Sequence, residues 1–287
     1  MGRTFAAFAL AAFAAAVTPA FGITGSWVDD HEHPYVGLIV FYNAKGEFIW
    51  RCSGSLINST KFLTAGHCAD TAGGAASARV YFQQDAGANF NPATGLDPIT
   101  GYPAACAGTT LGTMCAESMN GKIYNYGFAN FAGFPNTHDA GVVILDQAIT
   151  LPEYGVLPQP GVLDALGTAR GTKNTIFTVS GYGLTLRVQV HSALSNVSFR
   201  ERLMAKSTLV NLNSALNDGY NLQTQGNGDR RGGTCSGDSG GPVFLGGPTS
   251  NTIVAVTSFG LNALCRGTDF GYRIDRQDVL NWINNQQ

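Results

Sequence analysis

The most constraining feature of this chain is a short run of residues, Gly-Asp-Ser-Gly-Gly-Pro at positions 237–242. A serine hydroxyl is a poor nucleophile at neutral pH, and it needs an adjacent base and a preorganised anion site. Glycine adopts backbone turns that a residue with a Cβ resists. Such a turn would aim the amides of Gly237 and Ser239 at one point and form an oxyanion hole. The plain alternative is a glycine-rich turn in a secreted β protein.

A histidine and an aspartate upstream supply the partners that such a serine requires. His67 stands beside Cys68, and Asp139 opens the apolar run 140–145, which predicts a buried strand. A lone histidine is more often structural than catalytic. A buried carboxylate needs a partner, however, and an imidazole N–H pairs with it and fixes the tautomer that a general base needs.

The order His67, Asp139, Ser239 resembles that of the trypsin/chymotrypsin (S1-type) secreted serine proteases, and it differs from the orders in subtilisins and α/β-hydrolases. The resemblance extends over nearly the whole chain after the N-terminal segment. It includes residues 52–57 before the histidine, residues 257–260 along the substrate cleft, and a terminal helix from Asp275 onward.

This resemblance implies an all-β fold of two six-stranded antiparallel β-barrels, chymotrypsin-like, with a C-terminal helix. The first barrel would carry His67 and Asp139, and the second would carry Ser239. The implied activity is hydrolysis of peptide bonds through an acyl-enzyme on Ser239. Short β-type runs between turn signals independently favour a sandwich or barrel; they cover residues 35–42, 48–57, 79–83, 141–145, 176–180, 208–212, 242–245 and 253–259.

Composition and the N-terminus indicate a secreted single domain. The 287 residues are 44% hydrophobic and 13% charged, and the net charge of −2 suggests no nucleic acid or other polyanion as partner. Residues 1–22 predict a signal peptide, because Arg3 precedes an apolar stretch over 5–17 that is shorter than the ~20 residues of a membrane span. A signal anchor is the alternative. The protease domain then covers 23–287, as a monomer acting on proteins or peptides without a membrane partner.

Two further segments have predicted places in this domain. The connection between the barrels is expected near residues 151–167, where prolines cluster. The separation of His67 and Asp139 is longer than usual in the family, and the excess is expected over residues 85–130. That insertion is either a decorating surface loop or a loop that shapes substrate access.

The six cysteines suit an oxidising compartment, although the sequence alone does not choose their pairing. The resemblance implies a disulfide Cys52–Cys68, which would clamp the loop of the histidine. It also implies Cys235–Cys265 beside the cleft, and Cys106–Cys115 is then left.

The resemblance assigns further roles around the serine. Ser258 would donate a hydrogen bond to Asp139. Asp238 would pair with a new N-terminal α-ammonium at Ile23, within Ile-Thr-Gly-Ser. No Arg or Lys precedes Ile23, whereas Ala20 and Gly22 are small residues suited to a signal-peptidase site. Direct release of Ile23 is therefore expected, and cleavage after Ala20 is the rival.

Substrate preference has conflicting signals. The family position that holds an aspartate in trypsin-like members is Gly233 here, which argues against a strict Arg/Lys preference at P1, the residue before the cleaved bond. Gly260 matches an open pocket wall that would admit an apolar or aromatic P1 side chain. Asp269 instead favours a basic P1 if it enters the pocket from the opposite wall, and Phe270 would shorten the pocket.

No cofactor or metal is expected. Residues 69–78 contain a single acid, Asp70, which is too few for a calcium site. The main rival function is a protease-like binding protein that is catalytically silent. An esterase or lipase also fits the loose G-x-S-x-G pattern, but the residue order argues against it.

Overall fold

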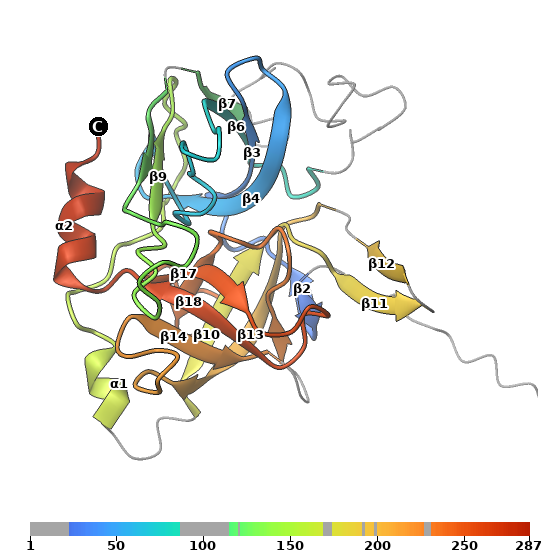
Figure 1. Ribbon diagram of the computed structural model, residues 1–287, viewed down its shortest axis with the longest axis vertical. Helices are drawn as coiled ribbons and strands as arrows, with labels where there is room; N and C mark the ends of the chain where they lie inside the picture. Colours follow the sequence, from blue (N-terminus) through green and yellow to red (C-terminus); the bar gives the residue numbers. More distant parts are fainter. Residues whose placement is uncertain are drawn as a thin grey trace, which may run out of the picture.

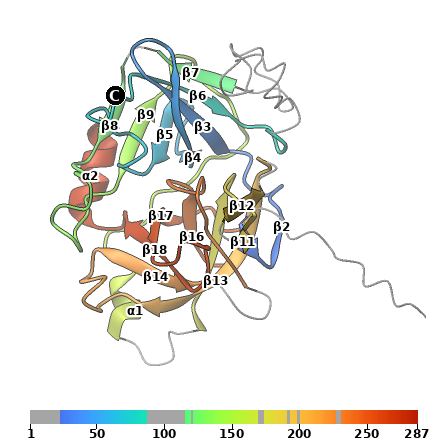
Figure 2. The ribbon, with the colours of Figure 1, turned by 45° about the vertical axis from the view of Figure 1, so that its right-hand side comes forward.

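The computed structural model describes residues 23–86, 115–119, 121–168, 174–190, 193–197, 200–226 and 231–287. The predicted signal peptide, Cys106 and most of the insertion over 85–130 lie outside these described residues. The chain forms two β-sheet bodies, one above the other in Figure 1, and Figure 2 shows the same arrangement from a second direction.

The first body is an antiparallel sheet of seven strands within the described residues. In spatial order they are β7 (Cys115–Ser118), β6 (Ser77–Tyr81), β3 (Val36–Tyr42), β4 (Phe48–Leu56), β5 (Lys61–Thr64), β9 (Gly141–Ile144) and β8 (Ile123–Asn125). Every residue of the apolar strand β3 is buried, so this strand anchors the core. The Asp146 amide, just after β9, donates to the Glu117 carbonyl of the edge strand β7 at 2.7 Å, so the curved sheet brings these two strands together.

The second body is a closed barrel. Its described strands follow the order β10 (Ile176–Gly181), β16 (Pro242–Leu245), β17 (Ile253–Gly260), β18 (Thr268–Arg273), β14 (Asn221–Gln225) and β13 (Leu203–Asn211). The barrel closes because β10 pairs with both β16 and β13. Strand β2 (Trp27–Asp29) pairs with β13 from outside. The predicted chymotrypsin-like class is confirmed, with the second body as the closed six-stranded barrel and the first as a curved half-barrel.

Short elements complete the fold. Strand β1 (Thr24–Gly25) pairs with β15 (Gly232–Gly233), and β11 (Leu186–Val190) pairs with β12 (Ala193–Val197) as a hairpin. Helix α1 (Asp164–Thr168) lies in the connection between β9 and β10. The expected C-terminal helix is α2 (Gln277–Asn285), and it buries Val279, Leu280 and Ile283 on one face.

Two predicted disulfides are present, Cys52–Cys68 and Cys235–Cys265. Cys115 is also disulfide-bonded, and its predicted partner Cys106 lies outside the described residues. Among the helices that the structure describes, none has the length and apolar character of a membrane span.

Candidate active site

The register between β5 and β9 places His67 next to Asp139. Thr64 at the end of β5 pairs with Gly141 at the start of β9. His67 follows β5 in a turn, and Asp139 precedes β9, so both residues lie at the same end of this antiparallel strand pair. A Cβ on Gly141 would lie 2.5 Å from the Ala65 carbonyl oxygen, so this close approach requires glycine.

Hydrogen bonds fix the orientation of the imidazole. His67 Nδ1 lies 2.9 Å and 3.1 Å from the two carboxylate oxygens of Asp139, and the His67 backbone amide donates to the same carboxylate at 2.7 Å. A carboxylate only accepts, so Nδ1 carries the hydrogen and Nε2 is the basic nitrogen of neutral His67. The hydroxyl of Ser258 also donates to Asp139, which is completely buried.

The charges of this pair stabilise each other. Burial alone would raise the pKa of Asp139, but the His67 charge and the hydrogen bonds from His67 and Ser258 lower it below its ordinary value. Burial likewise opposes the imidazolium, yet Asp139 holds the pKa of His67 above its ordinary value. The site can therefore accept a proton on His67 and stabilise the cation that results.

The loop of Ser239 lies against the strand that leads to His67. Its glycines Gly237 and Gly240 have φ of 99° and 78°, where a residue with a Cβ is strained. A Cβ on Gly240 would lie 2.1 Å from Thr64 Oγ1, so the contact with β5 also requires glycine. The Ser239 carbonyl accepts the Ser53 amide at 2.8 Å and lies 3.7 Å from Cys68 Sγ.

Asp238 is completely buried. Its two carboxylate oxygens accept the amides of Gly183 at 2.8 Å and Cys235 at 2.9 Å. Burial raises the pKa of Asp238 to about 7, although these hydrogen bonds act in the opposite direction. Ile23 is also completely buried, and the next residues pair with Gly232 and Gly233. In the continuous chain, the Ile23 nitrogen is a neutral amide bonded to Gly22.

A pocket of about 460 Å³ opens beside Ser239, and Ser258, Gly260 and Asp269 are among the residues that line it. Asp269 lies under Gly233, because a Cβ on that glycine would lie 2.4 Å from the Asp269 carboxylate. The carboxylate accepts the Thr234 amide at 2.9 Å. Burial raises the pKa of Asp269 to about 7, and the hydrogen bonds from Thr234 oppose this rise.

A cluster of aromatic side chains lies beside the pocket, and sequence reasoning assigned no role to two of its members, Phe131 and Phe134. Phe270 stacks on Phe259, with ring centroids 4.5 Å apart, and is buried instead of shortening the pocket. Phe131 and Phe134 contact Phe259 edge-on from the loop before Asp139, and each is about 40% exposed. The repeated Phe over residues 128–134 was the available signal.

One group of possible metal ligands contains His67. Ligand atoms of His67, Cys52 and Cys68 lie within 4.8 Å of one another. Both sulfurs belong to the Cys52–Cys68 disulfide, so neither is a thiolate that could bind a metal. The group is better described as the disulfide that holds the histidine turn.

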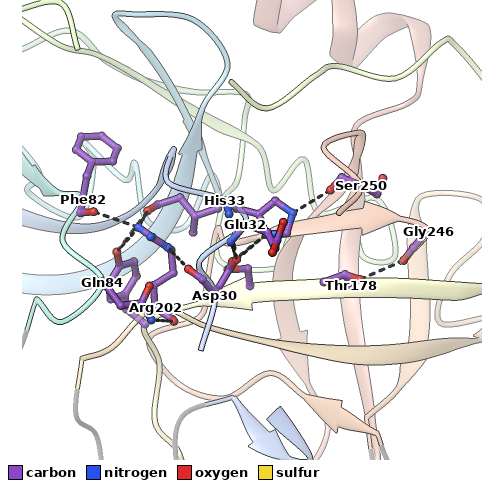
Figure 3. Close-up of polar contacts among 12 residues, drawn as sticks. Asp30, Glu32, His33, Phe82, Gln84, Thr178, Arg202, Gly246 and Ser250 are labelled. Atoms are coloured by element: carbon purple, nitrogen blue, oxygen red, sulfur yellow. Dashed lines mark hydrogen bonds and ion pairs between the residues drawn. The ribbon is translucent and has the colours of Figure 1, made fainter. Parts of the chain in front are cut away.

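A second histidine–aspartate pair lies in the interior and has a different character (Figure 3). His33 Nδ1 lies 2.8 Å and 2.9 Å from the carboxylate oxygens of Asp30, and Ser180 donates to that carboxylate. Unlike His67, His33 is almost completely buried, and its Nε2 lies 3.0 Å from the Ser250 carbonyl. A carbonyl only accepts, so this nitrogen carries a hydrogen and is not available as a base. The pair is therefore structural.

Arg202 extends this interior cluster across the two bodies, as Figure 3 shows. Its Nε donates to the Asp30 carbonyl at 2.8 Å, and its Nη1 donates to the Phe82 carbonyl at 3.1 Å. Phe82 follows β6 in the first sheet, whereas Arg202 precedes β13 in the barrel. The cluster therefore holds the two bodies together.

The sequence of this chain is similar to those of known proteases. A chymotrypsin of Phaedon cochleariae is 27% identical over 270 residues, which are 91% of this chain and 80% of the relative. CLIP domain-containing serine protease B9 of Anopheles gambiae is 25% identical over 228 residues, 77% of this chain and 52% of the relative. The chain thus spans about half the length of this mosquito protein, and 58% of the related B10 protease.

Solved structures agree in fold. HL collagenase aligns with a TM-score of 0.59 and 18% identity, covering 91% of this chain and 96% of the other. Human heparin binding protein aligns with a TM-score of 0.57 and 20% identity over 91% and 95% of the two chains. At such identities the likeness establishes the fold alone. The family model described as Trypsin matches residues 23–96 and 107–283, most of the sequence, so the chain belongs to the trypsin family.

Proposed function

We propose that this chain is a secreted, monomeric serine endopeptidase that hydrolyses peptide bonds with Ser239, His67 and Asp139. The observation that carries the proposal is the hydrogen-bonded pair of His67 and buried Asp139. This pair lies at the end of β5 and β9, and the Ser239 loop packs against β5. Membership in the trypsin family supports a serine protease and therefore protein or peptide substrates.

In the proposed mechanism, Ser239 Oγ attacks the carbonyl carbon of the substrate while His67 Nε2 takes the hydroxyl proton. The amides of Gly237 and Ser239 stabilise the negative oxygen of the tetrahedral intermediate. His67 then donates its proton to the leaving amine as the C–N bond breaks. Water, deprotonated by His67, then attacks the acyl carbon. The bond from that carbon to Ser239 Oγ breaks, and His67 returns the proton to Oγ as the carboxylic acid product leaves. Asp139 keeps Nδ1 protonated throughout and stabilises the imidazolium.

The function is tested by treating the secreted protein with a fluorophosphonate and then with a pool of peptides. Expected results are covalent labelling of Ser239 and cleavage that the reagent abolishes. If the protein neither labels nor cleaves although its N-terminus is mature, the silent binding protein is the correct alternative.

We propose that Ile23 is the mature N-terminus and that its α-ammonium pairs with Asp238. Burial raises the pKa of Asp238 to about 7 although Arg51 acts in the opposite direction, and a nearby ammonium would further favour the ionised form. Terminal sequencing of the active secreted protein should read Ile-Thr-Gly-Ser. An active form that begins at Phe21 would contradict this prediction.

We propose that the pocket prefers apolar or aromatic P1 residues and accepts basic ones only when Asp269 is ionised. Support comes from Asp269 in the pocket wall with a pKa raised to about 7, so its carboxyl is neutral below that pH and charged above it. Arg266 also lines the pocket, and Asp238 is the acidic neighbour of Asp269. The ratio of kcat/KM for Arg over Phe substrates should rise roughly tenfold between about pH 6 and about pH 8.

Two controls isolate the effect of Asp269. Protonation of His67 affects both substrates equally, so it cancels in the ratio. Asp269→Asn should make the ratio independent of pH, with a low value throughout. A ratio that still rises with pH in this variant would assign the effect to another group.

A further inference from the structure

Strand β4 runs along the side of the first sheet that faces the barrel (Figure 1), and Ser53 is a completely buried residue on it. The Ser53 amide donates to the Ser239 carbonyl at 2.8 Å, and the Ser53 carbonyl accepts the Thr64 hydroxyl at 2.8 Å. The backbone of Ser53 thus lies between the loop of the proposed nucleophile and the strand that leads to His67.

The side chain of Ser53 makes two further contacts, both with the barrel. Its hydroxyl donates to the Gly237 carbonyl at 2.8 Å and accepts the Tyr182 amide at 2.9 Å. A hydroxyl has one hydrogen to donate, and here that hydrogen is committed to Gly237. Neither glycine nor alanine at position 53 could make these two contacts.

We propose that Ser53 is a positioning residue for the oxyanion site of the proposed protease. The peptide group that it holds joins Gly237 to Asp238, and it therefore lies between the two proposed donors, the amides of Gly237 and Ser239. Gly237 has φ of 99° and no Cβ, so its own torsions restrain this peptide weakly. The amide end of this peptide is held by the Asp238 hydrogen bond to the Cys235 carbonyl at 3.0 Å, and its carbonyl end is held by the hydrogen bond from Ser53.

The contact of the Ser53 hydroxyl with the Tyr182 amide also acts on the Ser239 loop. Ser53 holds the Tyr182 amide, while Arg51 on the same strand donates to the Tyr182 carbonyl at 2.7 Å. The next amide, Gly183, donates to Asp238 inside the loop. Ser53 therefore fixes the nucleophile loop directly at Gly237 and indirectly through Asp238.

The test compares Ser53→Ala with Ser55→Ala. Ser55 lies two residues along β4 and is also buried, but its hydroxyl has no hydrogen-bond partner among the residues that the structure describes. Ser53→Ala should lower kcat about tenfold, the factor that loss of one buried hydrogen bond corresponds to, with KM nearly unchanged. Rates are expressed per site titrated with fluorophosphonate, so misfolded protein does not count. Ser55→Ala should keep the wild-type kcat.

A transition-state analogue separates positioning from a merely structural role. A peptidyl aldehyde forms a tetrahedral adduct, and its affinity should fall in Ser53→Ala in parallel with kcat. The affinity of the product peptide, which forms no such adduct, should not change. Ser53→Thr retains the hydroxyl and should retain aldehyde affinity.

Three results would overturn the proposal: unchanged kcat in Ser53→Ala, equal weakening of aldehyde and product peptide, or loss of aldehyde affinity in Ser53→Thr. The inference rests on the proposed function, and the wild type distinguishes the two failures. Wild-type protein that neither cleaves nor labels would refute the function, whereas an active wild type with an equally active Ser53→Ala would refute only the role of Ser53.

Discussion

Ser239→Ala is expected to lower kcat for peptide substrates on the order of 10⁶-fold, because it removes the only atom proposed to attack the carbonyl. The change deletes one oxygen and leaves the rest of the loop in place, since the contacts of Ser239 with Ser53 and Cys68 use its backbone carbonyl. KM should change little. The measurement is single-turnover and steady-state hydrolysis of one fluorogenic peptide by both proteins.

A small residual rate is expected in Ser239→Ala, because the oxyanion donors and the bound geometry still act on a water molecule. Ser55→Ala is the matched control, since it deletes a buried hydroxyl that has no hydrogen-bond partner in the described part of the chain. A Ser239→Ala protein within tenfold of wild-type kcat would show that another group is the nucleophile.

Asp30→Ala is expected to lower the free energy of unfolding by about 3–5 kcal/mol at neutral pH, the range found when one member of a buried charge pair is removed. The change leaves the His33 imidazole, the Ser180 hydroxyl and the His33 amide without their acceptor. Urea denaturation followed by fluorescence would measure the difference. Asp29→Ala is the control, because the neighbouring aspartate is exposed and should change stability by less than about 0.5 kcal/mol.

The pH dependence of this difference has a definite sign. Burial alone would raise the pKa of Asp30, but hydrogen bonds and the charge of His33 lower it below 3.8. A lowered pKa stabilises the fold above the unfolded value, and this stabilisation is lost as the pH falls through the folded value. The difference in free energy of unfolding between wild type and Asp30→Ala should therefore become smaller in acid. A constant gap down to about pH 2 would mean that Asp30 acts through packing and not through its charge.

The sequence predicted the apolar strands and missed the polar ones. Apolar runs became β3, β9, β16 and β17 with small changes at their ends. Strand β14 was not predicted because its sequence, Asn-Leu-Gln-Thr-Gln, has no apolar pattern. The side-chain NH2 group of its buried Asn221 donates to the carbonyls of Pro135 and Leu216, partners that only the folded chain supplies.

The candidate site shows the same division. The motifs predicted that His67 would meet Asp139, because apolar strands determine that pairing, and the structure brings them together. Sequence left Gly233 and Asp269 as competing signals, whereas in the folded chain they are neighbours: the absent side chain at 233 makes room for the carboxylate. Ser53 resembled any serine in a strand, since its partners lie 129 and 184 residues away.

The division of the proposed triad between the two bodies has a consequence for biosynthesis. His67 and Asp139 belong to the first sheet, which the ribosome completes before β10 begins, whereas the Ser239 loop belongs to the barrel. A nascent or half-folded chain therefore holds a base without its nucleophile. The barrel can close only after β16, β17 and β18 have been synthesised, and all three strands follow the Ser239 loop. The proposed catalytic site is therefore complete only late in folding, after the Ser239 loop has been synthesised and has packed against the first sheet.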